Sequence, residues 1–467
     1  MAFDSAAFLF FFLPLLLILE ALARGERAKN VLLCLAGLIF YAFGELWALA
    51  LLIASALVNW LLGLLAMGGK KYAAALAAVI NLALLGACKY LGFFGSGLAL
   101  LGVELSLPEI LAPAGVSFFT FKGISYVCDA ARRPQEGTRS FFEALFYISF
   151  LPEVMSGPLS RFSAFRAQLA RRERSWERTA QGARRFILGL GKKLLLSGAA
   201  AVIADAAFAA GDALTAPLAW LGAAAYSLQL YLDFSGYSDM AVGLGSMLGF
   251  ACPENFNYPY AAASITDFWR RWHISLSTWL KDYLYISLGG NRKGRFRTYV
   301  NLVVTMLLGG LWHGAAPRFV LWGGFHGLLL ALHKFLMRLF PRMKATGADM
   351  KRGWRIAGIF VTFHLVCLGW IFFRARDVGT GADILEQVFT NFDISLIPNI
   401  ITGYWEIFAM MLVGYVAHFT PRRLQERACD AVIRNPLAVN ALLIVVIIWV
   451  VMQVKSADIQ PFIYFQF

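Results

Sequence analysis

His313 stands out as a group suited to chemistry. It lies near the end of a 20-residue run without formal charge (residues 298–317), within the glycine-rich stretch LGGLWHGA at 308–315. An ionisable group in such a run is costly unless it faces a cavity, and the glycines allow close backbone approach or leave room for a pocket. A neutral imidazole near pH 7 can take a proton from an alcohol that attacks an acyl carbonyl. We therefore predict that His313 is a catalytic base.

His273 is the second candidate. It lies in DFWRRWHIS (267–275), where a histidine of an interfacial aromatic belt is the alternative interpretation. For His333, His364 and His418 we expect packing or interhelical hydrogen bonds. The sequence has no G-x-S-x-G or H-E-x-x-H motif, and its six cysteines are too scattered for a disulfide framework or a zinc site. We therefore predict acid–base chemistry without a metal.

The elements that position these residues are apolar. Of 467 residues, 59% are hydrophobic and only 15% charged, whereas soluble chains are roughly one-quarter charged. Several runs approach or exceed the roughly 20 residues that span a bilayer. The clearest are 46–69, 213–232, 298–317, 356–373 and 435–454, with shorter runs at 5–19, 30–44, 72–87 and 407–421. This pattern predicts an all-α integral membrane protein with about ten or eleven spans, folded as one polytopic domain over residues 1–467.

The net charge of +14 would suggest a nucleic-acid partner in a soluble chain. Here the positive residues gather between apolar runs, where they orient the spans, so no nucleic-acid partner is expected. Asp4 precedes the first apolar run and three basic residues follow it at 24–29, the reverse of a secretory signal. We expect a retained first span with its start outside, residues 24–29 in the cytosol, and the acidic segment 95–109 outside.

Three segments do not fit simple spans. Residues 141–160 are apolar but interrupted by Pro152, Gly157 and Pro158, which favours a broken or re-entrant helix buried in protein. Residues 161–193 carry a net charge of +8 and are expected on the cytosolic side, at anionic lipids or gripping an anionic cofactor. Residues 258–297 mix tryptophans with charges, which predicts interfacial helices and a partly buried polar element.

Several motifs carry a family resemblance: YSDM (237–240), PENFNYPY (253–260), residues 267–277, LGGNR (288–292), GGLWHGA (309–315), PAGVSF (113–118), residues 152–158 and PFIYFQF (461–467). With these motifs the sequence resembles the membrane-bound O-acyltransferase superfamily, and within it the bacterial alginate O-acetyltransferase branch, over nearly the whole chain. It departs from the branch at Lys122, where Gln is common, and at EVMS (153–156), where the branch often has a Gln-rich or Ala-rich version. These departures concern the acceptor or partner surface more than the chemistry.

The resemblance implies a ring of about eleven transmembrane helices around a thinned centre, with re-entrant helices forming a tunnel. It implies that His313 is essential and His273 supporting. It also implies no permanently bound cofactor and a cytosolic acyl thioester, acetyl-CoA by expectation, as donor. The acceptor would be an extracytoplasmic polysaccharide, reached directly or through an SGNH-hydrolase-like acetyltransferase partner. The protein would lie among the lipids of the bacterial inner membrane.

Three other functions remain open from the sequence. A teichoic-acid D-alanyltransferase would share the fold and the histidine but take its donor from a carrier protein. A lipid or sterol acyltransferase would need a long apolar slot. A transporter would show matching pairs of broken helices in two halves, and the sequence has no such symmetry. In the acetyl-transfer hypothesis, the basic segments 161–193 and 270–297 suit the phosphates of coenzyme A.

Overall fold

The computed structural model describes residues 1–44, 46–93, 95, 102, 112–340, 343, 350–421, 423–425 and 427. The regular elements within these residues are all helical. The first half contains η1 (Phe8–Phe12), α1 (Leu13–Leu22), α2 (Glu26–Ala42), α3 (Leu46–Met67), α4 (Tyr72–Lys89), α6 (Val116–Arg132), η2 (Pro134–Glu136), α7 (Phe141–Ile148), α8 (Phe162–Arg166), α9 (Trp176–Gly191), η3 (Lys192–Ser197) and α10 (Gly198–Phe208). The second half contains η4 (Gly211–Ala213), α11 (Ala216–Met247), η5 (Pro259–Ala261), α12 (Ile265–Arg271), α13 (Ile274–Trp279), η6 (Leu280–Tyr285), α14 (Arg295–His313), α15 (Pro317–Leu339), α16 (Arg352–Arg374), α17 (Val378–Thr390), α18 (Ile397–Gly403) and α19 (Trp405–Phe419).

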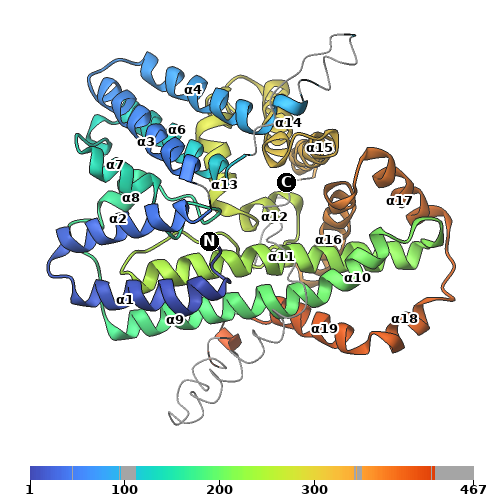
Figure 1. Ribbon diagram of the computed structural model, residues 1–467. Helices are drawn as coiled ribbons and strands as arrows, with labels where there is room; N and C mark the ends of the chain where they lie inside the picture. Colours follow the sequence, from blue (N-terminus) through green and yellow to red (C-terminus); the bar gives the residue numbers. More distant parts are fainter. Residues whose placement is uncertain are drawn as a thin grey trace.

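Two long helices form one side of the molecule. The continuous helix from α9 through η3 to α10 runs beside α11 in the lower half of Figure 1. Glycines at the contact bring the backbones together: a Cβ on Gly182 would lie 2.6 Å from the Gly243 carbonyl oxygen, and one on Gly189 would lie 2.5 Å from that of Gly236. The glycines on each helix are seven residues apart, so the same face meets its partner every two turns.

A helical hairpin of α14 and α15 lies on the opposite side of the molecule, at the top of Figure 1. Its helices also approach through glycines, because a Cβ on Gly310 or Gly323 would collide with a carbonyl of the facing helix. Gly314 begins the short turn and Pro317 starts α15, a position where proline loses no helical hydrogen bond. The predicted close approach around LGGLWHGA is therefore confirmed, and it places His313 at the tip of the hairpin.

Five helices of the described residues are long and apolar enough to cross a membrane: α3, α4, Trp176–Phe208, α15 and α16. The pair α18 and α19, bent by 88°, is a sixth if it counts as one span. The expected total of about eleven is not confirmed, and the predicted run 435–454 and most of segment 95–109 lie outside the described residues. The all-α fold with several membrane-spanning helices is as predicted.

One span was missed in the sequence. The basic segment 161–193 does not end before the membrane, because its second half is helix α9, which continues through η3 into the apolar α10. Because its first turns contain charged residues, this helix does not appear as an uncharged run in the sequence.

The irregular segments follow their predictions more closely. Helix α7 ends at Ile148, and the chain then runs through turns to Ser160 with Phe150 and Val154 buried, which is the expected broken helix inside protein. Residues 258–297 form the short helices η5, α12, α13 and η6 before α14 begins. Helices α12 and α13 lie near the middle of Figure 1, between α11 and the hairpin.

Candidate active site

His313 is the last residue of α14 and is 6% exposed. Its imidazole lies among the rings of Trp312, Trp322 and Phe373, with centroid distances of 4.8, 5.2 and 5.2 Å. The hairpin tip is anchored by Arg318, which donates hydrogen bonds of 2.7 Å to the carbonyls of Phe373 and Ala375 at the end of α16. Three helices therefore fix the position of this ring.

A cavity of about 120 Å³ adjoins His313. Its wall includes Lys89 at the end of α4, Trp312, and the start of α6 at Gly115 and Ser117. Gly115 has a φ of 80°, and a Cβ there would collide with the Val154 carbonyl, so the turn before α6 requires glycine. The cavity is thus bounded by an imidazole, an ammonium group and the positive end of a helix, a set that favours negative charge.

The second predicted residue, His273, is 1% exposed and has a φ of 43°, a conformation uncommon outside glycine. Its Nδ1 lies 3.1 Å from Asn255 Oδ1, which also accepts hydrogen bonds from the backbone N–H (3.2 Å) and hydroxyl (2.9 Å) of Ser275. Because an amide oxygen only accepts, Nδ1 carries the proton, and in the neutral ring Nε2 holds a lone pair. Sequence reasoning did not find this role of Asn255.

Trp312 connects the two histidines. Its ring lies 4.8 Å from that of His313 and 6.2 Å from that of His273, and it also packs on Phe118 and Phe121 of α6. The two candidates, 40 positions apart in the chain, are therefore brought to one aromatic cluster.

The remaining four histidines make other contacts, although His326 shares the ring of Trp322 with His313. His333 Nδ1 bonds Thr266 Oγ1 at 2.8 Å, and His418 Nε2 accepts from the Tyr260 N–H at 3.2 Å, so both make the expected contacts between segments. His364 bonds the Phe360 carbonyl of its own helix. His326 is fully buried among Trp269, Trp322 and Trp370 and serves as packing. Within the described residues, no three His, Cys, Asp or Glu side chains gather as metal ligands.

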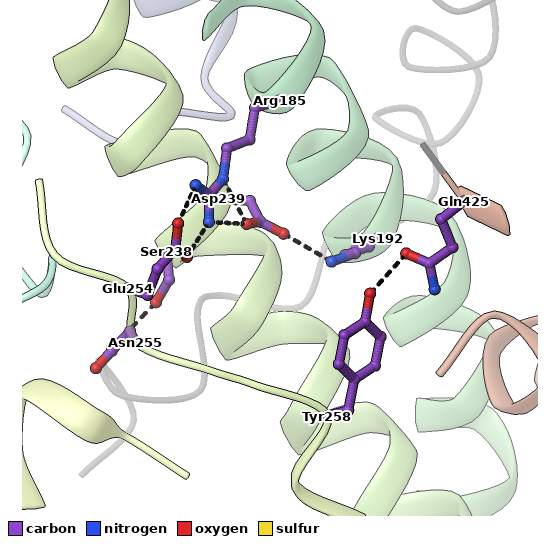
Figure 2. A network of polar contacts seen from close by, with 8 residues as sticks. All are labelled: Arg185, Lys192, Ser238, Asp239, Glu254, Asn255, Tyr258 and Gln425. Atoms are coloured by element: carbon purple, nitrogen blue, oxygen red, sulfur yellow. Dashed lines mark hydrogen bonds and ion pairs between the residues drawn. The ribbon is translucent and has the colours of Figure 1, made fainter. Parts of the chain in front are cut away.

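A polar network joins α9, α11 and the loop that supports His273 (Figure 2). Arg185 bonds both carboxylate oxygens of Glu254 at 2.6 and 2.5 Å and Asp239 Oδ1 at 2.9 Å, while Lys192 bonds Asp239 Oδ2 at 2.6 Å. The adjacent Asn255 donates to Ser238 Oγ at 3.2 Å. The YSDM and PENFN motifs therefore secure the loop that orients His273.

Pairing changes the electrostatic character of segment 161–193. At least eight of its ten basic residues form ion pairs with carboxylates of the described residues: Arg161, Arg166, Arg172, Arg174, Arg178, Arg185, Lys192 and Lys193. In contrast, residues 291–297 are all exposed and include Arg292, Lys293, Arg295 and Arg297. The run 291–297 therefore presents more exposed positive charge than segment 161–193.

The two departures from the branch pattern lie against each other. Lys122 Nζ bonds Glu153 Oε2 at 2.8 Å, and both side chains are at most 1% exposed. Ser160 Oγ donates to the same oxygen at 2.7 Å, and the ammonium lies 4.3 Å from the centre of the Tyr147 ring. Lys122 and Glu153 therefore form one internal ion pair, whereas Met155 and Ser156 of the EVMS motif line the cavity beside His313.

The fold and the site define a multi-pass membrane protein with a buried histidine at a cavity, and comparisons with known proteins identify its class. Residues 98–375 match the model of the MBOAT, membrane-bound O-acyltransferase family. The chain is 38% identical to the "Probable alginate O-acetylase AlgI" of Pseudomonas putida, with 100% of both chains covered. It is 33% identical to the "Peptidoglycan O-acetyltransferase" of Helicobacter pylori, over 82% of this chain and 79% of that protein.

A more distant similarity is to the "Teichoic acid D-alanyltransferase" of Bacillus subtilis, 28% identical over 57% of this chain and 70% of that protein. The chain belongs to the membrane-bound O-acyltransferase family. It is therefore a membrane enzyme that transfers an acyl group to a hydroxyl oxygen.

Proposed function

We propose that this chain moves an acetyl group from a cytosolic thioester, acetyl-CoA, to hydroxyls of an extracytoplasmic polysaccharide in the bacterial inner membrane. The observation that carries the proposal is the position of His313, a buried imidazole at the tip of the α14–α15 hairpin beside a cavity. The similarity to alginate and peptidoglycan O-acetylating proteins supports acetyl as the group and a polysaccharide as the acceptor.

In this proposal His313 is the general base. Its neutral imidazole takes the proton of the acceptor hydroxyl as that oxygen bonds to the thioester carbonyl carbon. The carbon–sulfur bond then breaks, and the leaving thiolate takes the proton back from the imidazolium. The products are an ester and a free thiol, and His313 is again neutral. His273, held by Asn255, supports the site through the shared packing on Trp312.

The donor's phosphates need cations on the cytosolic side. Because the basic residues of segment 161–193 are mostly engaged with carboxylates, the exposed run 291–297 is the better candidate. Phosphates form strong charge-assisted hydrogen bonds with Arg and Lys, so Arg292 and Lys293 are the first residues to test. The hydroxyl that receives the acetyl group belongs to the polysaccharide itself or to a serine of a partner acetyltransferase that completes the transfer outside.

The test uses everted membrane vesicles from polysaccharide-producing cells, supplied with acetyl-labelled acetyl-CoA. Wild-type vesicles should transfer label to polymer. His313→Ala should lower the rate by about 10²- to 10⁴-fold, as expected for loss of a general base. His364→Ala is the matched control, because His364 bonds its own helix, and it should keep the wild-type rate. Normal transfer by a well-inserted His313→Ala variant would refute the assignment.

The D-alanyl alternative differs in its donor. A carrier-protein thioester would be required, and acetyl-CoA would leave wild-type vesicles unlabelled. The same experiment therefore separates the two donors, with a D-alanyl carrier protein as the second substrate.

A further inference from the structure

Lys89 is the one formal charge in α4, and it occupies the last position of that helix. It is half-buried and lines the same cavity as His313. An ionisable residue at the end of an apolar helix, facing a cavity, marks a functional site by default. The sequence pattern does not single out Lys89, because the apolar run 72–87 ends just before it.

Other buried lysines of this chain are matched by carboxylates. Lys122 pairs with Glu153 at 2.8 Å, and Lys193 pairs with Asp233 at 2.5 Å. Among the described residues, no carboxylate forms an ion pair with Lys89. Its recorded hydrogen bond is to the carbonyl oxygen of His313, at 3.5 Å. An ammonium group has three donors, so this single long contact leaves capacity for a ligand.

Capping of α14 does not by itself require the charge of Lys89. The neighbouring Tyr90 already donates a hydrogen bond of 2.6 Å to the Leu311 carbonyl in the same last turn. A phenol provides that hydrogen bond without the cost of burying a charge. Lys89 contacts a different carbonyl, that of His313, at 3.5 Å, and this one contact leaves two of the three ammonium donors for a ligand.

We propose that Lys89 is a catalytic residue that stabilises the oxyanion of the acyl-transfer step. This inference rests on the proposed function. When the hydroxyl oxygen bonds to the thioester carbon and its proton passes to His313, the carbonyl π pair moves to oxygen. The Lys89 ammonium donates a hydrogen bond to that oxyanion, and the charge returns to the carbonyl as the thiolate leaves. A fixed cation in a site with little water is effective because it requires no reorganisation during the reaction.

The first turn of α6 forms another part of the cavity wall, at Gly115, Val116 and Ser117. The positive end of its helix dipole favours the same developing negative charge. Lys89 and this turn therefore act in the same direction, while His313 removes the proton.

The experiment compares Lys89→Met with Tyr90→Phe in the vesicle assay. Lys89→Met should lower kcat by about 10²- to 10³-fold, the usual loss when one oxyanion donor is removed. The KM for acetyl-CoA and the thermal midpoint of the detergent-purified protein should stay unchanged. Tyr90→Phe loses a capping hydrogen bond but no charge, so it should keep the rate, and Lys89→Arg should restore part of it.

A second donor gives a readout that a structural role would not affect. Fluoroacetyl-CoA forms an intrinsically more stable oxyanion, so the loss in Lys89→Met should be smaller with it than with acetyl-CoA. Wild-type activity in Lys89→Met, equal losses with both donors, or equal losses in Tyr90→Phe with a lowered midpoint would overturn the inference. If wild-type vesicles transfer no acetyl group, the proposed function fails and this inference with it. Failure of Lys89 alone appears as an active Lys89→Met variant.

Discussion

Lys89 and Lys122 lie on the neighbouring helices α4 and α6, yet their surroundings differ. Lys122 is enclosed by a carboxylate, a serine hydroxyl on that carboxylate and an aromatic ring. Lys89 faces a backbone carbonyl and a cavity that also holds His313. A buried charge with a partner is part of the fold, whereas one directed at a cavity is available to a ligand.

The same distinction holds on a larger scale. Along α9 and α11, Arg185 and Lys192 share Asp239, so the basic helix is neutralised where it enters the protein (Figure 2). Around His313 the neighbouring rings are aromatic, and the described residues that line the cavity include an ammonium group and a helix start but no carboxylate. The first region provides rigidity and the second provides a place for charge to develop during a reaction. Variants of Lys122 and Asn255, each with a matched control, test this division.

The largest effect is expected on stability, at Lys122. Lys122→Met leaves the Glu153 carboxylate buried without its cation, which costs about 3–5 kcal/mol for a buried ion pair. Thermal unfolding of the purified protein in detergent should show a clearly lower midpoint, and activity should fall only as far as folded protein is lost. The double variant Lys122→Met with Glu153→Leu is the control, because removing both charges should restore most of the midpoint. A Lys122→Met protein as stable as wild type, with impaired acetyl transfer, would mean that Lys122 serves function and not stability.

A smaller effect, on activity, is expected at Asn255. Asn255→Ala removes the acceptor that holds His273 Nδ1–H, and loss of orientation should lower kcat by roughly 10- to 100-fold. Ser238→Ala is the matched control, since it removes only the hydrogen bond from Asn255 Nδ2 and should keep most of the activity. Initial rates in vesicles, with expression and midpoint measured in parallel, decide the matter. Unchanged rates in Asn255→Ala would return His273 to the role of an aromatic-belt residue.

The sequence predicts a structural feature well when the residues that cause the feature are close together in the chain. The close approach at LGGLWHGA and the broken helix after Ile148 follow from residues that are neighbours in the chain, and the same local pattern makes His313 a candidate. The continuation of α9 into α10 did not, because its charges are neutralised by Asp239 and Glu254, about 50 and 70 positions away. Lys89 was equally hidden, since its contact with His313 joins residues 224 positions apart. Pairing between charges that are far apart in the chain depends on the fold, and the hydrophobic periodicity of the sequence does not predict it.

Two cysteine reporters test the orientation of the basic region, and we expect neither to change activity. Ser175 and Asp212 are exposed residues that flank the continuous helix Trp176–Phe208, which is long and apolar enough to cross the membrane. If the basic end is cytosolic, as the positive-inside rule predicts, the two positions lie on opposite sides. In a variant without the six native cysteines, Ser175→Cys should react with a membrane-impermeant thiol reagent only after permeabilisation, whereas Asp212→Cys should react in intact cells.

The pattern of labelling also bears on the mechanism. Arg292 and Lys293 must share the side of Ser175 if they receive the phosphates of a cytosolic donor, and a cysteine replacing the exposed Phe296, between Arg295 and Arg297, reports on that side. Protection of Phe296→Cys together with Ser175→Cys in intact cells is the expected result. Labelling of both in intact cells would invert the protein and place the available cations away from coenzyme A. Labelling of Phe296→Cys alone would keep the orientation of α9 but remove residues 291–297 as the entrance for the donor.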